Sequence, residues 1–203
     1  MVGIGKNGLA GSASSEVGKG LQVHAVEWSS RANGPGRRAV IWFQGCTLAC
    51  PGCFNPATHA TSDGYMTYTG QLAADLGVRA DQIEGISISG GEPFQQPDAL
   101  LDLLQRLDGS GLSRLLFSGY GLAELLRQPL GAAILAHADV LIAGRYLARH
   151  QRGHALLGSA NQRVHLLTNR YTLTDLIPVP RCEVILHTDG SYTVSGIGPF
   201  SIS

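Results

Sequence analysis

Residues 44–56 read Gln44-Gly45-Cys46-Thr47-Leu48-Ala49-Cys50-Pro51-Gly52-Cys53-Phe54-Asn55-Pro56. The three cysteines have the spacing CxxxCxxC and follow the apolar run Ala39–Phe43, which predicts a β-strand. They therefore lie on a loop at the carboxyl end of that strand. Thiolates are preferred ligands of iron–sulfur clusters, and short spacing lets one loop contact several irons. The stretch predicts a metal site with ligands Cys46, Cys50 and Cys53, in which one iron of a four-iron cluster has no local cysteine.

Structural zinc is the alternative to an iron–sulfur cluster. Zinc takes four protein ligands, usually as two CxxC-like pairs, and a second pair is absent from this sequence. Either Cys182 or His59 is a candidate for completing such a site. Because Cys182 stands alone, we expect it to be a small buried residue instead.

The composition narrows the classes of partner. Fifteen Lys and Arg balance fifteen Asp and Glu, so the chain has no general electrostatic attraction for nucleic acid or an anionic membrane. The lysines, Lys6 and Lys19, both lie near the N-terminus, which argues against Schiff-base chemistry and a phosphate-binding P-loop. No apolar run reaches the roughly 18–20 residues that span a membrane, and no secretory signal pattern is present. We therefore expect a cytoplasmic protein with no membrane association, in which clustered cysteines indicate a metal rather than disulfides.

Strand and helix patterns alternate from residue 21 onward. The predicted strands are Gln22–Trp28, Ala39–Phe43, Gly85–Ser89, Leu115–Ser118, Asp139–Ile142 and Val164–Leu167. The predicted helices are Thr69–Leu76, Gln96–Leu107, Leu122–Leu126 and Ala132–Ala136. This alternation predicts an α/β fold of βαβ units with a parallel sheet, whose functional residues lie at the carboxyl ends of the strands.

The domain organisation is simple. Residues 1–20 are rich in Gly and Ser and predict a flexible tail, and residues 21–203 predict a single domain without an internal repeat. Near the end, Glu183–Thr188 and Ser191–Ser195 flank Asp189-Gly190, a strong signal for a hairpin spanning residues 181–197.

A second motif helps to interpret the set of three cysteines, which lacks a fourth ligand. Ser89-Gly90-Gly91-Glu92-Pro93 follows the predicted strand Gly85–Ser89, which is the next strand after the cysteine loop. A glycine-rich turn alone is a weak signal. In this order, however, the cysteine loop and the turn resemble the radical S-adenosylmethionine (SAM) superfamily, which carries CxxxCxxC after a strand and a GGE(P) motif.

Further motifs resemble one branch of that superfamily. In chain order they are Gly34-Pro35-Gly36-Arg37, Pro51–Pro56, Ser118-Gly119-Tyr120, Asp139–Gly144 and Gly158–Gln162. The series is similar to the activating enzymes of anaerobic (class III) ribonucleotide reductase, and to glycyl-radical activating enzymes more broadly. Three positions depart from the pattern. Gly52 replaces a common aromatic residue, Ala143 an acidic residue and Leu157 a basic one.

The resemblance implies a fold and a set of ligands. The fold is an incomplete parallel (β/α) barrel with a C-terminal hairpin, since a full barrel takes about 200–250 residues. Cys46, Cys50 and Cys53 hold a [4Fe-4S] cluster, and SAM chelates the fourth iron. The implied cofactor-binding residues are Gly52, Cys53, Phe54, Gly90, Gly91, Glu92, Pro93, Ser118, Gly119 and Tyr120.

Individual roles follow from the same resemblance. The backbone at Gly90 and Gly91 approaches the methionine part of SAM, and the backbone at 52–54 meets the adenine. Glu92 accepts a hydrogen bond from a neighbouring backbone group or from the SAM ammonium, with a solvated loop carboxylate as the alternative. Ser118 hydrogen-bonds the ribose or carboxylate and Tyr120 packs on the ligand, although purely structural roles are as plausible for both.

The implied reaction is reductive cleavage of SAM to a 5′-deoxyadenosyl radical, which abstracts hydrogen from a partner protein such as a glycyl-radical enzyme. Flavodoxin or ferredoxin supplies the electron. One alternative is a radical SAM enzyme that modifies a peptide or a natural-product precursor, and another is a non-catalytic iron–sulfur or zinc module. The Arg- and His-rich stretch at 145–154 predicts a solvated loop, with a docking surface as the second interpretation.

Overall fold

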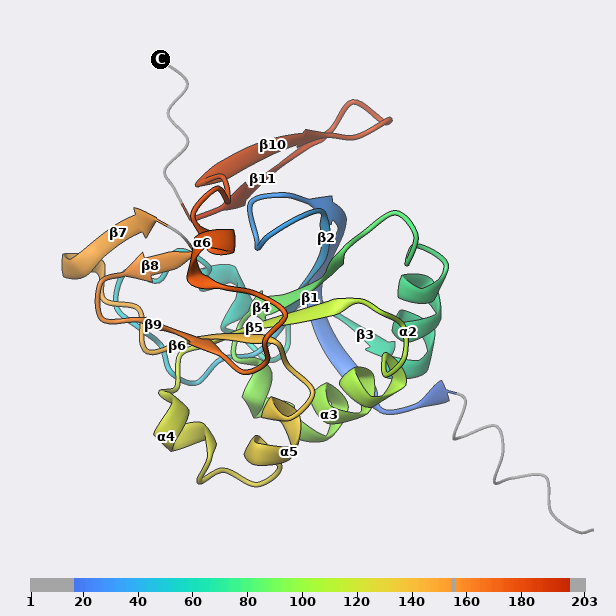
Figure 1. Ribbon diagram of the computed structural model, residues 1–203, viewed down its shortest axis with the longest axis horizontal. Coiled ribbons are helices and arrows are strands. Elements are labelled where there is room, and N and C mark those ends of the chain that lie inside the picture. The colour runs from blue at the N-terminus through green and yellow to red at the C-terminus, as the bar shows by residue number, and fades with distance from the viewer. Residues whose placement is uncertain (1–16, 155, 198–203) are drawn as a thin grey trace, which may run out of the picture.

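The computed structural model describes residues 17–154 and 156–197 (Figure 1). The predicted tail 1–20 therefore falls mostly outside the described residues. The first strand already begins at Gly20, and Lys19 next to it donates a backbone hydrogen bond to Thr69 Oγ1. Among the described residues, no helix combines the length and apolar character that a membrane span requires.

The elements occur in an alternating order. The strands are β1 (Gly20–Ser30), β2 (Arg38–Phe43), β3 (Tyr65–Tyr68), β4 (Gly85–Gly90), β5 (Ser113–Ser118), β6 (Val140–Ala143), β7 (Gln151–His154), β8 (Leu157–Ser159), β9 (Arg163–Leu166), β10 (Cys182–Leu186) and β11 (Tyr192–Gly196). The α-helices are α2 (Thr69–Gly77), α3 (Pro97–Arg106), α4 (Leu122–Leu125), α5 (Gly131–Leu135) and α6 (Leu173–Leu176). Short 3₁₀ helices are η1 (Pro56–Thr58), η2 (Pro93–Gln95) and η3 (Ala148–His150). Each predicted strand and helix is present, whereas β3, β7, β8, α6 and the 3₁₀ turns were not predicted.

The main sheet has seven strands in the order β3-β1-β2-β4-β5-β6-β9. Strands β2, β4, β5 and β6 are mutually parallel, as predicted. The expectation of a parallel sheet throughout is wrong at both edges, because β1 and β9 run antiparallel to their neighbours and β3 runs antiparallel to β1. Only residues 31–37 connect β1 to β2, which is too short for the crossover that parallel strands require. The fold is mixed α/β with a partly parallel sheet.

The two faces of the parallel strands are covered differently. One face packs against the helices α2, α3 and α5, which lie together on one side of the sheet in Figure 1. The buried strand residues on that face are Ala39, Ile41, Phe43, Ile86, Ile88, Leu116 and Leu141. Trp42, Ser89 and Phe117 alternate with them, and successive strand residues point to opposite faces, so these three face away from the helices.

A fully buried arginine joins the amino ends of three parallel strands. Arg38 begins β2, and its guanidinium donates to Ser87 Oγ and Ile86 O of β4 and to Ser113 Oγ of β5. Within the described residues no carboxylate forms a salt bridge with it, and burial lowers the pKa of Arg38 below its ordinary value. Carbonyl and hydroxyl oxygens replace water around this cation, and such hydrogen bonds are costly to remove.

The predicted C-terminal hairpin is present as β10 and β11 and is anchored to the sheet. The Glu183 carboxylate accepts hydrogen bonds from Ser30 Oγ and from the backbone N–H of Arg31, and Asn33 Nδ2 donates to Ser195 Oγ at 2.6 Å. Cys182, expected to be buried, is partly exposed on β10.

Replacing Arg38 with Met should lower the free energy of unfolding by about 2–4 kcal/mol, because the variant leaves several buried oxygens without their donor. Urea unfolding of the metal-free protein measures this change. The matched control is Arg37→Met at the exposed neighbouring position, where we expect less than about 0.5 kcal/mol. Equal losses in the two variants would show that Arg38 has no special structural role.

Candidate functional site

The cysteine loop leaves the carboxyl end of β2 and turns back on itself. Gly45 N donates to Thr58 O at 2.8 Å and Cys46 N donates to His59 O at 3.0 Å, so backbone bonds fix the loop against η1 and the residue after it. Cys46, Cys50 and Cys53 are free and partly exposed, and their side chains line one cavity. The structure thus brings the three predicted ligands together.

Burial raises the pKa of the Cys46 and Cys53 thiols above the ordinary value. Both thiols therefore stay protonated until a cation displaces the proton, and metal binding at this loop releases protons. Among the described residues, no group of three or more His, Cys, Asp or Glu is arranged to hold a single metal ion. His59 lines the same cavity, whereas Cys182, on the hairpin, does not.

The Gly90–Gly91 turn packs directly on the start of the cysteine loop. Gly91 N donates to Phe43 O at 2.8 Å and Glu92 N donates to Gly45 O at 2.9 Å. Gly90 has a φ of +98°, and a Cβ at Gly91 would lie 2.3 Å from Gly45 O. Any side chain at Gly91 would displace the cysteine loop. Glycine at this position is therefore what allows the two motifs to line the same cavity.

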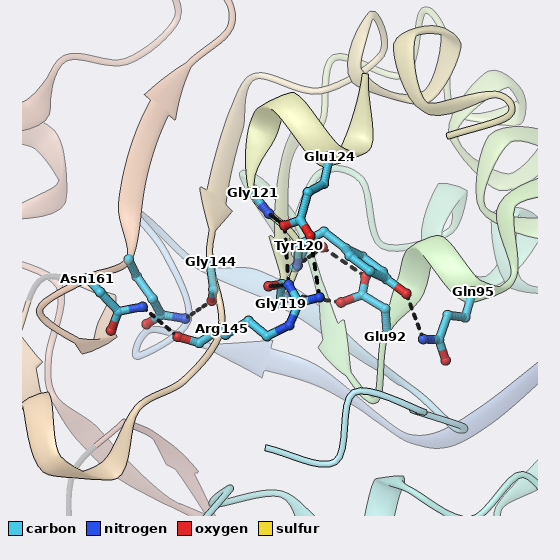
Figure 2. A network of polar contacts seen from close by, with 11 residues as sticks. Glu92, Gln95, Gly119, Tyr120, Gly121, Glu124, Gly144, Arg145 and Asn161 are labelled. Carbon is cyan, nitrogen blue, oxygen red and sulfur yellow. Dashed lines mark hydrogen bonds and ion pairs between the residues drawn. The ribbon is translucent and has the colours of Figure 1, made fainter. Parts of the chain in front are cut away.

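Glu92 is buried and joins the carboxyl ends of β4 and β5. Its carboxylate accepts from Gly119 N at 2.7 Å (Figure 2), and also from Ser118 Oγ at 2.9 Å and Phe94 N at 3.1 Å. The side chain is 1% exposed, so the interpretation as a solvated loop carboxylate is wrong and that of a carboxylate bonded to neighbouring backbone is confirmed. Burial raises the pKa of Glu92 to about 7, and the donors from Gly119, Phe94 and Ser118 only partly oppose this effect.

The remaining predicted residues divide into two groups. Ser118 and Gly119 line the cysteine cavity with Phe54, Gly90, Gly91 and Glu92. Gly52, Pro93 and Tyr120 are not among its lining residues.

Tyr120 belongs to a polar network beside the cavity. Its hydroxyl accepts from Gln95 Nε2 at 3.0 Å, and the Arg145 guanidinium lies 5.1 Å from its ring centroid. Gln95 in turn donates to Thr47 Oγ1 and accepts from Thr47 N, so the network reaches the cysteine loop. Figure 2 shows Tyr120 between Gln95 and Arg145.

Arg145 is part of this network rather than of a solvated loop. It forms a salt bridge with Glu124 at 3.2 Å and donates to Gly119 O. Arg149 and His150 further along the stretch are exposed, as predicted.

Several lining residues were missed by sequence reasoning. They are Leu48, Asn55, Ser89, Phe117, Gly144, Tyr146 and Gln162. Phe117 could have been found from the alternation in β5. Gln162 ends the motif Gly158–Gln162, to which the sequence assigned no role. Its side chain accepts from Gly158 N at 2.8 Å and donates to Gly144 O at 3.0 Å, which ties two glycine turns together.

Comparisons with known proteins agree with this geometry. Residues 32–165 match the family model described as "4Fe-4S single cluster domain". The chain is 35% identical over 145 residues to the anaerobic ribonucleoside-triphosphate reductase-activating protein of Vibrio cholerae, covering 67% of this chain and 92% of that protein. The corresponding protein of Escherichia coli K12 is 33% identical over 144 residues, covering 66% of this chain and 92% of that protein.

Two further similarities cover less of the other protein. The pyruvate formate-lyase-activating enzyme of Clostridium pasteurianum is 30% identical over 126 residues, which cover 60% of this chain and 50% of that protein. Among solved structures, QueE from Escherichia coli gives a TM-score of 0.43 at 18% identity, covering 49% of this chain and 52% of that chain. The likeness to QueE is too weak to characterise the chain.

The cysteine loop, the glycine turn packed on it and the matched family define an iron–sulfur enzyme of the radical SAM class. The chain belongs to the 4Fe-4S single cluster domain family and, within it, to the radical SAM activating enzymes of glycyl-radical proteins. Its cofactors are a [4Fe-4S] cluster and SAM.

The Glu92 carboxylate should make stability depend on pH. Its pKa in the folded protein is about 7 against an ordinary value of 4.5. Between these values the folded state holds a proton that the unfolded state has released, so the free energy of unfolding falls as pH rises and then levels off. The contribution amounts to about 3 kcal/mol. Glu92→Gln does not titrate and should lack this component when metal-free proteins are compared by urea unfolding at pH 5 and pH 8. An identical pH dependence in both proteins would contradict the burial of this carboxylate.

Gly91→Ala should displace the cysteine loop, because the added Cβ meets Gly45 O at 2.3 Å. We expect a several-fold lower iron content after anaerobic reconstitution, measured by iron and sulfide analysis. Gly77→Ala is the control, since a Cβ at Gly77 meets no atom within 4 Å. Full iron content in the Gly91 variant would exclude the tight packing as a requirement for the site.

Proposed function

We propose that this chain generates a glycyl radical on an anaerobic ribonucleoside-triphosphate reductase. The observation that carries the proposal is the shared cavity, in which three cysteines and the Gly90–Gly91 turn lie together. The relatives named as activating proteins of that reductase are matched over about nine-tenths of their length, 92% for the protein of Vibrio cholerae. The match to a pyruvate formate-lyase-activating enzyme covers 50% of that protein and supports a second partner less well.

The residues present fit the two cofactors. Cys46, Cys50 and Cys53 would supply three thiolates to the cluster, which would leave one iron without a local cysteine and available to SAM. When bound, the reduced cluster and SAM together supply a 5′-deoxyadenosyl radical. The reductant we propose is flavodoxin or ferredoxin, because the chain itself contains no second redox centre among its described cysteines.

The chain's own groups position the cofactors and exclude water. The backbone at Gly90 and Gly91 can approach the methionine part because no side chain intervenes. The backbone around Cys53 and Phe54 borders the same cavity and is the proposed adenine contact. Glu92 is already engaged by Ser118 and Gly119, so its proposed role is to hold the two loops in place.

The fold supports the same function. We propose that the open, partly parallel sheet is an incomplete (β/α) barrel and that residues 21–203 form one radical SAM domain. The face of β2, β4 and β5 turned away from the helices then forms the inside of the barrel. An incomplete barrel leaves a wide opening, which suits a protein substrate better than a small enclosed one.

The test is activation of the reductase. The anaerobically reconstituted chain, reduced and supplied with SAM, should form 5′-deoxyadenosine and give a glycyl radical, seen by electron paramagnetic resonance, on an added anaerobic ribonucleoside-triphosphate reductase. SAM cleavage without a radical on the reductase would point to another substrate. No SAM cleavage by a protein that carries zinc would refute the function.

Cys50→Ala should reduce 5′-deoxyadenosine formation to background, because the cluster loses one of its three protein ligands. Cys182→Ala is the matched control, since Cys182 lies on the hairpin and does not line the cavity, and it should retain wild-type turnover. Turnover that persists in the Cys50 variant would refute the ligand assignment.

A further inference from the structure

A second cavity of about 310 Å³ adjoins the cysteine cavity. The two share the lining residues Phe54, Asn55, Ser89, Phe117 and Gln162, so one opens beside the other. The larger cavity lies on the sheet face opposite the helices. No Asp, Glu, Lys or Arg lines it in the described part of the chain. Among the described residues His24 is the one basic side chain that an anionic small molecule would meet there, whereas an uncharged segment loses little by entering.

One wall of this cavity comes from the C-terminal hairpin. Thr193, Val194, Ser195, Gly196 and Ile197 of β11 and its end line it. These residues lie beyond the region 32–165 that matches the family model, so the wall is a feature of this chain that the family match does not include.

The wall is held rigidly. Asn33 lines the same cavity and donates to Ser195 Oγ, and Glu183 on β10 accepts from Ser30 and from the backbone of residues 31–32. A pre-organised wall costs little entropy when a partner binds.

The other face of the hairpin is apolar and uncovered. Val184 pairs with Val194 and Leu186 with Tyr192, and cross-strand partners point to the same face. Their exposed fractions are 40%, 44%, 80% and 68%, respectively. In Figure 1 the hairpin projects from the body of the molecule, and no other described segment lies over its outer side. Contiguous exposed apolar side chains of this kind mark interaction surfaces, and surfaces that bind other proteins are among them.

Val194 connects the two surfaces. Its side chain belongs to the apolar ladder formed by Val184, Leu186, Tyr192 and Val194, and strand β11 borders the cavity at this residue. A partner that covers the ladder is therefore already at the mouth of the cavity next to the cysteines.

We propose that the hairpin β10–β11 is the docking element for the protein substrate, and that β11 guides an extended, uncharged, glycine-containing segment of that substrate into the 310 Å³ cavity. This inference rests on the proposed function and adds the surface that selects the partner. Within residues 17–154 and 156–197, strand β11 pairs only with β10, so no strand of that part of the chain occupies its second edge, which can accept the backbone of an extended segment.

The probe is acetyl-Ala-Ser-Gly-Tyr-Ala-amide, added to the reconstituted protein with SAM bound. Hydrogen exchange should show protection of the amides of residues 193–197 by the peptide. Direct titration should show binding at least about tenfold weaker for Val194→Glu, because an uncharged segment paired with the edge of β11 would then lie beside a carboxylate. Val194→Thr keeps the shape without a charge and should lose less affinity than Val194→Glu does. Val78→Glu introduces the same charge at an exposed valine outside the cavity and should have no effect.

A second peptide distinguishes the effect of the new charge from misfolding of the Val194→Glu variant. The peptide acetyl-Ala-Lys-Gly-Lys-Ala-amide should bind Val194→Glu more tightly than it binds the wild type, which a damaged protein would not do. If the variant fails to fold, the protection of residues 193–197 in the wild type still tests the proposal.

Three results would overturn the inference: unchanged binding of the neutral peptide by Val194→Glu, no protection of β11 by the peptide, or equal protection of β11 by SAM alone. The proposed function fails separately, through the absence of 5′-deoxyadenosine from the wild-type protein. If the wild-type protein cleaves SAM but peptide binding does not depend on the hairpin, the proposed function is supported and only the docking role of the hairpin is refuted.

Discussion

The site depends on the close approach of two backbone segments at the carboxyl ends of β2 and β4. Gly91 donates to Phe43 O, Glu92 donates to Gly45 O, and a side chain on Gly91 would collide with the Gly45 carbonyl. This contact makes the cysteine loop and the glycine turn into walls of one cavity. A parallel pairing of β2 with β4 is what brings both ends to the same edge of the sheet. The fold and the site are thus two consequences of one strand pairing.

Two buried ionisable groups lie at opposite ends of the parallel strands. Arg38 at the amino ends is bonded to hydroxyl and carbonyl oxygens, and Glu92 at the carboxyl ends is bonded to backbone N–H groups and Ser118. Neither forms a salt bridge among the described residues, so each depends on neutral groups from neighbouring strands. Such groups fix the strand register, because a slip of one residue would leave them without partners.

Local patterns predicted most of the fold and the gathering of three cysteines at one cavity, because alternation, cysteine spacing and glycine turns each occupy a short stretch of sequence. They did not predict the antiparallel edges, since pairing direction depends on connection length and on strands such as β3 with weak local signals. Nor did they predict that Glu92 would be buried by Ser118 and Gly119, which lie 26 and 27 residues away. The wall that residues 193–197 contribute to the second cavity depends on Asn33, 162 residues before Ser195, a contact that no local pattern contains.

The start of β1 has a practical consequence for handling the protein. Lys19 immediately precedes this strand, and the chain's other lysine is Lys6. The start of β1 and the hairpin β10–β11 lie on different sides of the molecule in Figure 1. Lysine-directed coupling to a sensor chip or a fluorophore will therefore attach the molecule through the segment before β1. Immobilised in this way, the protein leaves its hairpin, on a different side of the molecule, exposed to the solution without engineered tags.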